Sequence, residues 1–399
     1  MTTSGSLLQR VLLIVIVLPF SAYAQQDSFK AVNIDSSKVQ IKTSDPANST
    51  ATCTVSDEPI LVIGDNEEDE YQIFSSIRGT GRLSDGSIAV ADRTSAEIRI
   101  FDEAGQHLRS MGRRGNGPGE FKNPFILWVA EGDTIWVGDY RPWRYKLFTS
   151  KGDFIRQVSL EPEYLNPSSA GGGVLDNGFT VNTIRKGVRG ADFTVDDTLI
   201  VEVHDPRGTL KGSLVRMPNR PARPLREGAL FMVSPLFSSW AMVDARGETI
   251  ALAHGSKPEV QILDNNLNLK TIIRWIDPLR EVKRNDIRAS RQNYRNARDP
   301  SRWGESDDDM VSRDRPVADF FPALSRVEVG RDGWIWVRKY NRPGEDGGWL
   351  AFNGDGEFVC HMATLPGSPD EFGEDWVLLL GESESGAETV QLHRLTRPL

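Results

Sequence analysis

The stretch SDGSIAVADRTSAEIRIFDEAGQHLRSM, residues 84–111, alternates apolar and polar residues between turns that contain glycine. Such alternation is typical of antiparallel β-strands. The pattern returns in EGDTIWVGDYRPWRYKLFTSKGDFIRQVSL, residues 131–160, and the first turn glycines of three successive copies, Gly86, Gly132 and Gly178, are 46 residues apart. Two further copies begin near DARGETIALAH and GRDGWIWVRKY. A strand repeat of this length is typical of the blades of a β-propeller.

The copies account for five blades, and the two ends of the chain can supply a sixth. The C-terminal hairpin, residues 375–395, lacks one strand, and Ile60 to Ile63 near the other end can provide it. Closure of this kind removes the exposed edge that an open array of sheets would leave. We therefore expect an all-β, six-bladed β-propeller closed by strands from both termini.

One segment, residues 277–315, interrupts the repeat between the fourth and fifth blades. After Asp277 and Pro278 it has no glycine or proline before Pro300, which predicts a helical insertion. Its arginines fall at helical spacing on one face: Arg284, Arg288, Arg291, Arg295 and Arg298. This face is either a basic lid over the propeller opening or a solvated surface paired with neighbouring acids.

The start of the chain has the pattern of an export signal. An apolar run from Val11 to Phe20 is followed by Ala22-Tyr23-Ala24, a small-x-small cleavage pattern, so residues 1–24 are predicted to be a signal peptide. Residues 25–57 are polar and are expected to be flexible, and residues 58–399 are expected to form the propeller. We expect an exported protein, periplasmic or secreted, without a lipid anchor, without a membrane span after signal removal, and monomeric.

Two cysteines remain, Cys53 and Cys360. An even count in an exported protein favours a disulfide, and two unrelated thiols are the alternative. The formal net charge of −9 argues against nucleic acid as a general partner, because that binding relies on a basic field.

The glycine-rich stretch GRRGNGPGEFKNPF, residues 112–125, lacks the Gly-Lys-Ser/Thr ending and the helix that a phosphate loop requires. It is better explained as the joint between two blades. Together with the strands that follow, it resembles the NHL-type repeats of six-bladed propellers. From about Pro59 the chain is similar to exported bacterial six-bladed β-propeller proteins. That resemblance implies the fold and little about activity, since such propellers include binding scaffolds, lyases and lactonases.

The sequence contains no local signature of a catalytic or metal site, so the catalytic residues are unknown. No two of the five histidines (His107, His204, His254, His361 and His393) have zinc-ligand spacing. His254 occupies the position at which the first two copies have Asp92 and Asp139. It is interpreted either as the cap of a turn or as a ligand residue. We expect no cofactor, with a divalent metal such as calcium in the central channel as the alternative.

The predicted loops open on one or the other face of the propeller, and the loops of the two faces differ in charge. The turns of one face, Asp244 among them, are mainly acidic, whereas the loops that join blades are rich in arginine and aromatic residues. Arginine beside aromatic rings suits anionic or carbohydrate-like ligands and protein partners. The predicted ligand-binding residues are Arg113, Arg114, Arg141, Trp143, Arg144, Arg185, Lys339, Tyr340 and Arg342.

These observations favour an extracytoplasmic binding or interaction module for an anionic or carbohydrate-like ligand or an envelope protein. The alternative is a metal-assisted lyase or hydrolase, similar to a lactonase, with its site in the central channel. A structural component of a larger envelope assembly is the third possibility.

Overall fold

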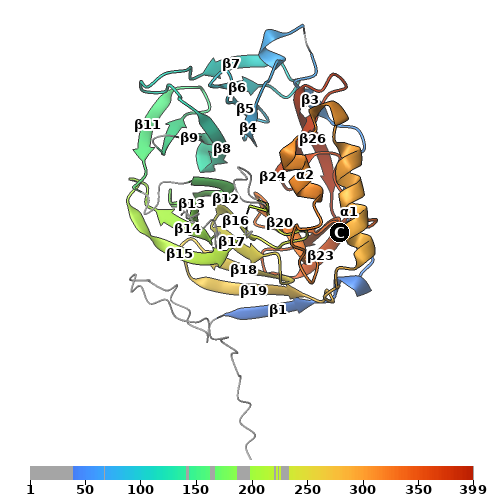
Figure 1. The fold of residues 1–399 in the computed structure, drawn as a ribbon. Coiled ribbons are helices and arrows are strands. Elements are labelled where there is room, and N and C mark those ends of the chain that lie inside the picture. Colours follow the sequence, from blue (N-terminus) through green and yellow to red (C-terminus); the bar gives the residue numbers. More distant parts are fainter. Residues whose placement is uncertain are drawn as a thin grey trace, which may run out of the picture.

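The computed structural model describes residues 39–66, 68–140, 143–161, 167–186, 198–219, 222, 224–225 and 233–398. The regular secondary structure of the described part of the chain is mainly β-strand, with two α-helices. Four-stranded units follow one another around a common centre in a propeller-like arrangement (Figure 1). In each unit the first strand lies innermost, which leaves the inner strands facing one another across the centre.

Most units are four-stranded antiparallel meanders. The first consists of β4 (Ile77–Arg82), β5 (Ile88–Asp92), β6 (Glu97–Phe101) and β7 (His107–Met111). The second consists of β8 (Pro124–Ala130), β9 (Thr134–Asp139), β10 (Arg144–Phe148) and β11 (Phe154–Ser159). The third consists of β12 (Pro167–Leu175), β13 (Thr180–Lys186), β14 (Thr198–His204) and β15 (Leu210–Pro218). The fourth consists of β16 (Ala241–Gly247), β17 (Thr249–His254), β18 (Glu259–Asp264) and β19 (Leu269–Trp275). The next consists of β20 (Leu324–Val329), β21 (Ile335–Lys339), β22 (Trp349–Phe352) and β23 (Phe358–Met362). The C-terminal strands β24 (Ser368–Phe372), β25 (Trp376–Glu382) and β26 (Glu388–Thr396) are completed by β3 (Leu61–Ile63), which pairs with β26.

The third and fourth units are joined into one sheet, because their inner strands β12 and β16 pair in parallel. Glycines in β12 permit this approach. A Cβ atom at Gly171 would lie 1.8 Å from the carbonyl oxygen of Val243, and one at Gly173 would lie 1.6 Å from that of Ala245. Both distances are far below any real contact, so a side chain at either position would separate the two strands.

The evenly spaced glycines occupy equivalent turns between the first and second strands of their units. Gly86, Gly132 and Gly178 have φ of 88°, 67° and 78°, a conformation that disfavours residues with a side chain. The stretch 112–123 connects the outer strand β7 to the inner strand β8. The repeat and the joint were therefore predicted correctly from the sequence.

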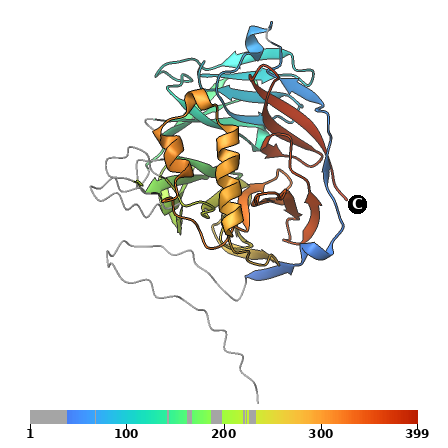
Figure 2. The same cartoon turned by 45° about the vertical axis from the view of Figure 1, so that its right-hand side comes forward.

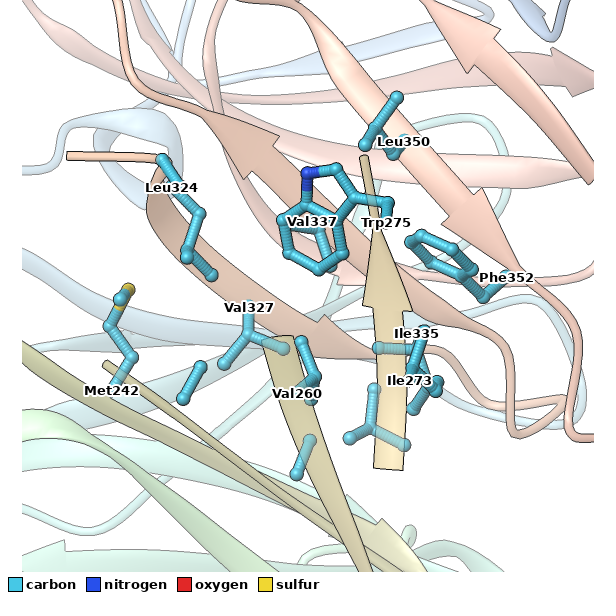
Figure 3. Packing of buried hydrophobic residues seen from close by; sticks show 14 residues of the cluster. Met242, Val260, Ile273, Trp275, Leu324, Val327, Ile335, Val337, Leu350 and Phe352 are labelled. Atoms are coloured by element: carbon cyan, nitrogen blue, oxygen red, sulfur yellow. The ribbon is translucent and has the colours of Figure 1, made fainter. Parts of the chain in front are cut away.

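Hydrophobic clusters fill the interfaces between neighbouring units. Figure 3 shows one of them, in which Val260, Ile273 and Trp275 pack against Val327 and Ile335. The remaining interfaces are closed by pairs of residues such as Ile98 with Leu127, Tyr145 with Ile184, Val201 with Leu252, Trp349 with Phe372, and Val90 with Leu378. Since every unit is packed on both sides, removal of apolar area from water stabilises the whole ring.

The N-terminal strap, residues 40–63, lies along the outside of three units. β1 (Gln40–Ser44) pairs in parallel with β19, a 3₁₀ turn follows at Pro46–Asn48, and β2 (Thr54–Val55) pairs with β26. Between them Cys53 forms a disulfide with Cys360 of β23, with the two Cα atoms 5.6 Å apart. The expectation that residues up to 57 are flexible is therefore wrong for residues 39–57, because backbone pairing holds them against the sheets. A further 3₁₀ turn, Glu70–Gln72, leads into β4.

The helices lie between β19 and β20 in the chain. α1 (Arg284–Ala297) and α2 (Glu305–Val311), separated by a 3₁₀ turn at Pro300–Arg302, stand at the outside of the sheets (Figure 2). Their segment is attached through an apolar cluster in which Ile287 and Phe321 contact Leu236 and Phe237 of the connection between β15 and β16. A 3₁₀ turn, Glu131–Asp133, lies between β8 and β9. Neither described helix has the length and apolar character of a membrane span.

Candidate functional site in the central channel

The inner strands β4, β8, β12, β16, β20 and β24 surround the centre of the molecule (Figure 1). Residues of these strands line a cavity of about 460 Å³. Its wall combines glycine and apolar residues with charged side chains. The charged lining residues are Arg78, Asp244, Arg246, Arg326, Glu328, Asp370 and Glu371. An ionic lining in an enclosed space makes this channel the strongest candidate for a functional site among the described residues.

Glu371 organises the end of the channel next to the first hairpin turns. Its buried carboxylate accepts hydrogen bonds from Arg246 Nη1 at 2.7 Å, from Arg331 Nε at 2.7 Å and from the backbone N of Arg82 at 2.9 Å. Arg331 also donates to the carbonyl oxygen of Arg82. Charge-assisted bonds of this kind fix both partners. Both oxygens of the Glu371 carboxylate are therefore occupied by donors from the protein.

Two further carboxyls are held in the middle of the channel. Asp244 Oδ2 accepts from the backbone N of Val329 at 2.6 Å, and Asp370 Oδ2 accepts from the backbone N and the hydroxyl of Thr80 at 2.6 and 2.7 Å. Both carboxyls touch the channel but are surrounded by protein, and this enclosure raises the pKa of each above its usual value. They are therefore poorer anions than exposed aspartates.

Glu328 is the most strongly perturbed carboxyl of the channel. Burial raises its pKa to about 7, the neighbouring Arg326 opposes that shift, and Asp244 reinforces it. Arg326 donates from Nε to Glu328, and its other nitrogens donate to Ser368 Oγ at 3.0 Å and to the carbonyl oxygen of Pro369 at 2.6 Å. Glu328 is consequently able to exchange a proton near neutral pH beside a fixed guanidinium.

Arg78 differs from the other charged residues of the wall. It projects from the inner strand β4, and its side chain is exposed to the channel. Among the described residues no hydrogen-bond or ion-pair partner of this guanidinium is found, whereas every other charged residue of the lining has one. The channel therefore presents one guanidinium without a partner among the described residues, with Phe125 and Trp240 in the same wall.

Those predicted ligand-binding residues of the loop face that the structure describes do not form a single site. Arg113 is exposed and forms an ion pair with Glu120 at 2.7 Å, and Arg114 donates to the carbonyl oxygens of Thr94 and Lys122. Trp143 lies in the core, and the predicted role of its ring in a ligand site is therefore wrong.

The prediction that Arg144 binds a ligand is also wrong. It is buried, and its Nε and Nη2 both donate to Asp139 Oδ2, at 3.0 and 2.7 Å. These two residues lie opposite each other in the β9–β10 pair, so the arginine is bound within its own hairpin. Its guanidinium is not available to a ligand.

Of the remaining predicted residues, Lys339, Tyr340 and Arg342 fall within four consecutive positions of the chain, and Tyr340 and Arg342 both lie against the ring of Phe321. Arg342 pairs with Asp277 and Glu345, and Tyr340 packs against the rings of Phe321 and Trp240. Lys339 ends β21, and the backbone of Arg185 lies in β13. Arg141 lies outside the described residues, as does the predicted signal peptide, residues 1–24.

The prediction placed Asp244 among the turns of the acidic face, which is wrong, because Asp244 lies within β16 and lines the channel. A signal for the channel residues does exist in the sequence. Charged or polar residues stand two positions apart in the first strand of a copy, as in Asp244 and Arg246 or Arg326 and Glu328. Residues at that spacing share one face of a strand, and the face of an inner strand points to the centre.

The structure shows no preformed metal cluster among the described residues, where no group of three or more His, Cys, Asp or Glu side chains is arranged around a common point. His254 Nδ1 lies 2.7 Å from the hydroxyl of Ser256, and Asp92 accepts from the backbone N of Thr94. Both side chains thus make the contacts of a turn cap.

Comparisons with known proteins agree with a β-propeller. Residues 72–143 match the model of the family DUF5128, described as a 6-bladed beta-propeller. A candidate exported protein from Bacteroides fragilis is 8% identical with a TM-score of 0.49, covering 90% of this chain and 100% of that chain. A member of the DUF4221 family from Bacteroides vulgatus is 12% identical with a TM-score of 0.48, and the match covers 88% of this chain and 100% of that chain. Streptogramin B lyase is 11% identical with a TM-score of 0.36, and the match covers 82% of this chain and 94% of that chain. No curated protein matches the chain.

Proposed function

We propose that the protein is an exported six-bladed β-propeller with NHL-type repeats that binds a small anionic ligand in its central channel. In this count β12–β15 and β16–β19 are two blades joined through their inner strands, and α1 and α2 belong to an insertion between the fourth and fifth blades. Residues 1–24 act as the signal peptide, and the mature protein is periplasmic or secreted. The proposal includes no resident cofactor.

The observation that carries the proposal is the unpaired guanidinium of Arg78 in a channel whose other charged side chains each have a hydrogen-bond partner. A carboxylate that enters the channel gains a paired hydrogen bond from the arginine fork. The enclosed surroundings strengthen this bond, because water screens it less than at an open surface. Phe125 and Trp240 in the same wall offer apolar contact to the body of an organic acid or sugar acid.

The Arg78→Ala variant is expected to lose this binding. A hydrogen bond to a charged group contributes roughly 1.5–3 kcal/mol, which corresponds to at least about tenfold in affinity. Isothermal titration of the mature protein with a panel of small carboxylic and sugar acids measures the change. Arg207→Ala is the matched control, since Arg207 is an exposed turn arginine outside the channel lining. Equal affinities of the Arg78→Ala variant and the wild type would contradict a channel site.

The second candidate function is a metal-assisted lyase or hydrolase, similar to a lactonase, with calcium as the candidate metal. Glu328 favours it, because a carboxyl with a pKa of about 7 is suited to general acid–base catalysis. Asp244 and Asp370 are the carboxyls nearest in the wall, and each would exchange its present backbone partner for the ion.

Metal analysis of mature protein purified without chelator discriminates between the two functions. One tightly held divalent ion per chain, together with turnover of a lactone panel that Glu328→Gln abolishes, would favour the enzyme. Metal-free protein whose thermal midpoint is unchanged by chelator would favour the binding protein.

A further inference from the structure

A second charged cavity lies on the helical segment, away from the channel. A pocket of about 420 Å³ is formed by one face of α1 and the residues at and after the end of α2. Its lining residues are Arg288, Ala289, Arg291, Gln292, Arg295, Val311 and Arg313. The lining thus contains four guanidinium groups and no carboxylate, and it shares no residue with the channel.

The acidic residues of the helical segment whose contacts are known do not pair with the arginines of this pocket. Asp307 accepts from Arg298 Nε at 2.8 Å and from the Tyr294 hydroxyl at 2.7 Å, and these bonds lower its pKa to about 2. Asp308 accepts from the indole of Trp303 at 2.9 Å, and Asp286 accepts from the backbone N of Lys283, the residue that precedes α1. Arg298 is therefore compensated, as the solvated-surface interpretation predicts for the whole face.

The arginines of the pocket are not compensated in this way. Arg291 Nη2 donates to the carbonyl oxygen of Ser312 at 2.8 Å, which holds one wall of the pocket in place. Arg288, Arg295 and Arg313 are exposed, and no partner of their guanidinium groups is found in the described part of the chain. The pocket therefore concentrates positive charge in a protein whose formal net charge is −9.

This concentration is unfavourable for the helix itself. Arg288 and Arg291 are three residues apart and Arg291 and Arg295 are four apart, so their side chains are neighbours on α1. Like charges at these spacings destabilise a helix. A ligand that neutralises the cluster would remove this repulsion.

We propose that this pocket is a site for a multiply charged oxyanion of the phosphate type, either free or at the end of a larger molecule. A planar guanidinium donates two parallel hydrogen bonds to phosphate oxygens, and several converging guanidinium groups can share one dianion. A single carboxylate has too few oxygens and too little charge to engage four arginines. The proposal is independent of the channel site, because the two cavities have no residue in common.

Titration calorimetry of the mature protein with inorganic pyrophosphate at low salt tests the site. The double variant Arg288→Ala/Arg295→Ala is expected to bind at least about tenfold more weakly, since it lacks two charge-assisted contacts. The control is Arg284→Ala/Arg302→Ala, which removes the same charge from exposed positions of the same segment outside the pocket. All the substituted side chains are exposed, so thermal midpoints no lower than that of the wild type are expected and verify that the variants fold. The pocket variant can melt slightly higher, because it lacks the repulsion between neighbouring arginines.

Wild-type affinity in the control and weaker binding in the pocket variant would support the site. Equal weakening in both variants, or no pyrophosphate binding by the wild type, would overturn it, because the charge would then act only as a diffuse field. Cosedimentation with vesicles that contain phosphatidic acid identifies the source of the group. Vesicle binding that the pocket variant loses and pyrophosphate displaces assigns a lipid headgroup, whereas pyrophosphate binding without vesicle binding assigns a soluble phosphate compound.

Discussion

At the scale of single residues, the repeat was easier to predict than the site. The turn glycines follow from backbone geometry alone, so their even spacing could be interpreted without knowledge of what surrounds them. Charged residues depend on their neighbours. Arg144 was expected to face a ligand, but the antiparallel register places Asp139 directly opposite, and the two neutralise each other. Sorting charges by loop also missed Glu328, because Glu328 lies within the strand β20 and not in a loop.

The protonation of Glu328 has a measurable effect on stability. Its pKa of about 7 in the folded protein lies above the ordinary value of 4.5, so the folded state retains a proton that the unfolded state releases between these pH values. Stability is therefore greater at pH 5 than at pH 8, by up to about 3 kcal/mol, and is lost as pH rises through this window. The Glu328→Gln variant should lose this contribution.

Urea unfolding of wild type and Glu328→Gln at several pH values provides the measurement. The difference between the two profiles isolates Glu328 from other groups, such as His204, whose pKa burial lowers to about 4 and whose effect on stability has the opposite sign. Parallel profiles would mean that Glu328 is ionised throughout and would contradict the perturbed pKa.

At the scale of elements, apolar patterns were a good guide to the central strands and a poor one to the strands that are added at the outside. β3 was predicted to close the final sheet and pairs with β26. β1 was missed because its side chains are mostly exposed, and its place on β19 depends on backbone hydrogen bonds, for which no apolar pattern is needed. The helical insertion was recognisable because an interior without glycine or proline stands out among glycine-rich turns.

A truncation series measures what the outer elements contribute. A chain that begins at residue 57 loses the disulfide and the pairing of β1 and β2, and a disulfide alone contributes roughly 2–5 kcal/mol. A chain that begins at residue 64 also loses β3, which leaves β26 unpaired along its outer edge and should broaden the unfolding transition. Denaturant unfolding compares both with a chain that begins at residue 39.

The control for the cross-link is Cys53→Ser in the longest chain, which removes the disulfide and keeps every strand. If the chain that begins at residue 64 unfolds with the same midpoint and slope as the chain that begins at residue 57, β3 contributes nothing to the closure of the molecule.

At the scale of the whole molecule, a repeat of strands was sufficient to predict a propeller-like arrangement, since each copy must bury both faces against its neighbours. The junction of β12 with β16 was not predicted, because the glycines of β12 show their purpose only when the opposing carbonyl oxygens are known. Function was the least predictable property, because the fold positions a channel but does not determine what enters it.

The pairing of β3 with β26 also sets an order in time. During synthesis β3 is made before β4 and every later strand, and its partner β26 is made after all the other described strands. Until residue 396 has been added, the nascent protein is an open row of sheets with an unpaired edge at each end, the form most exposed to wrong association. The synthesis of β26 therefore determines when residues 61–63 can reach their final place.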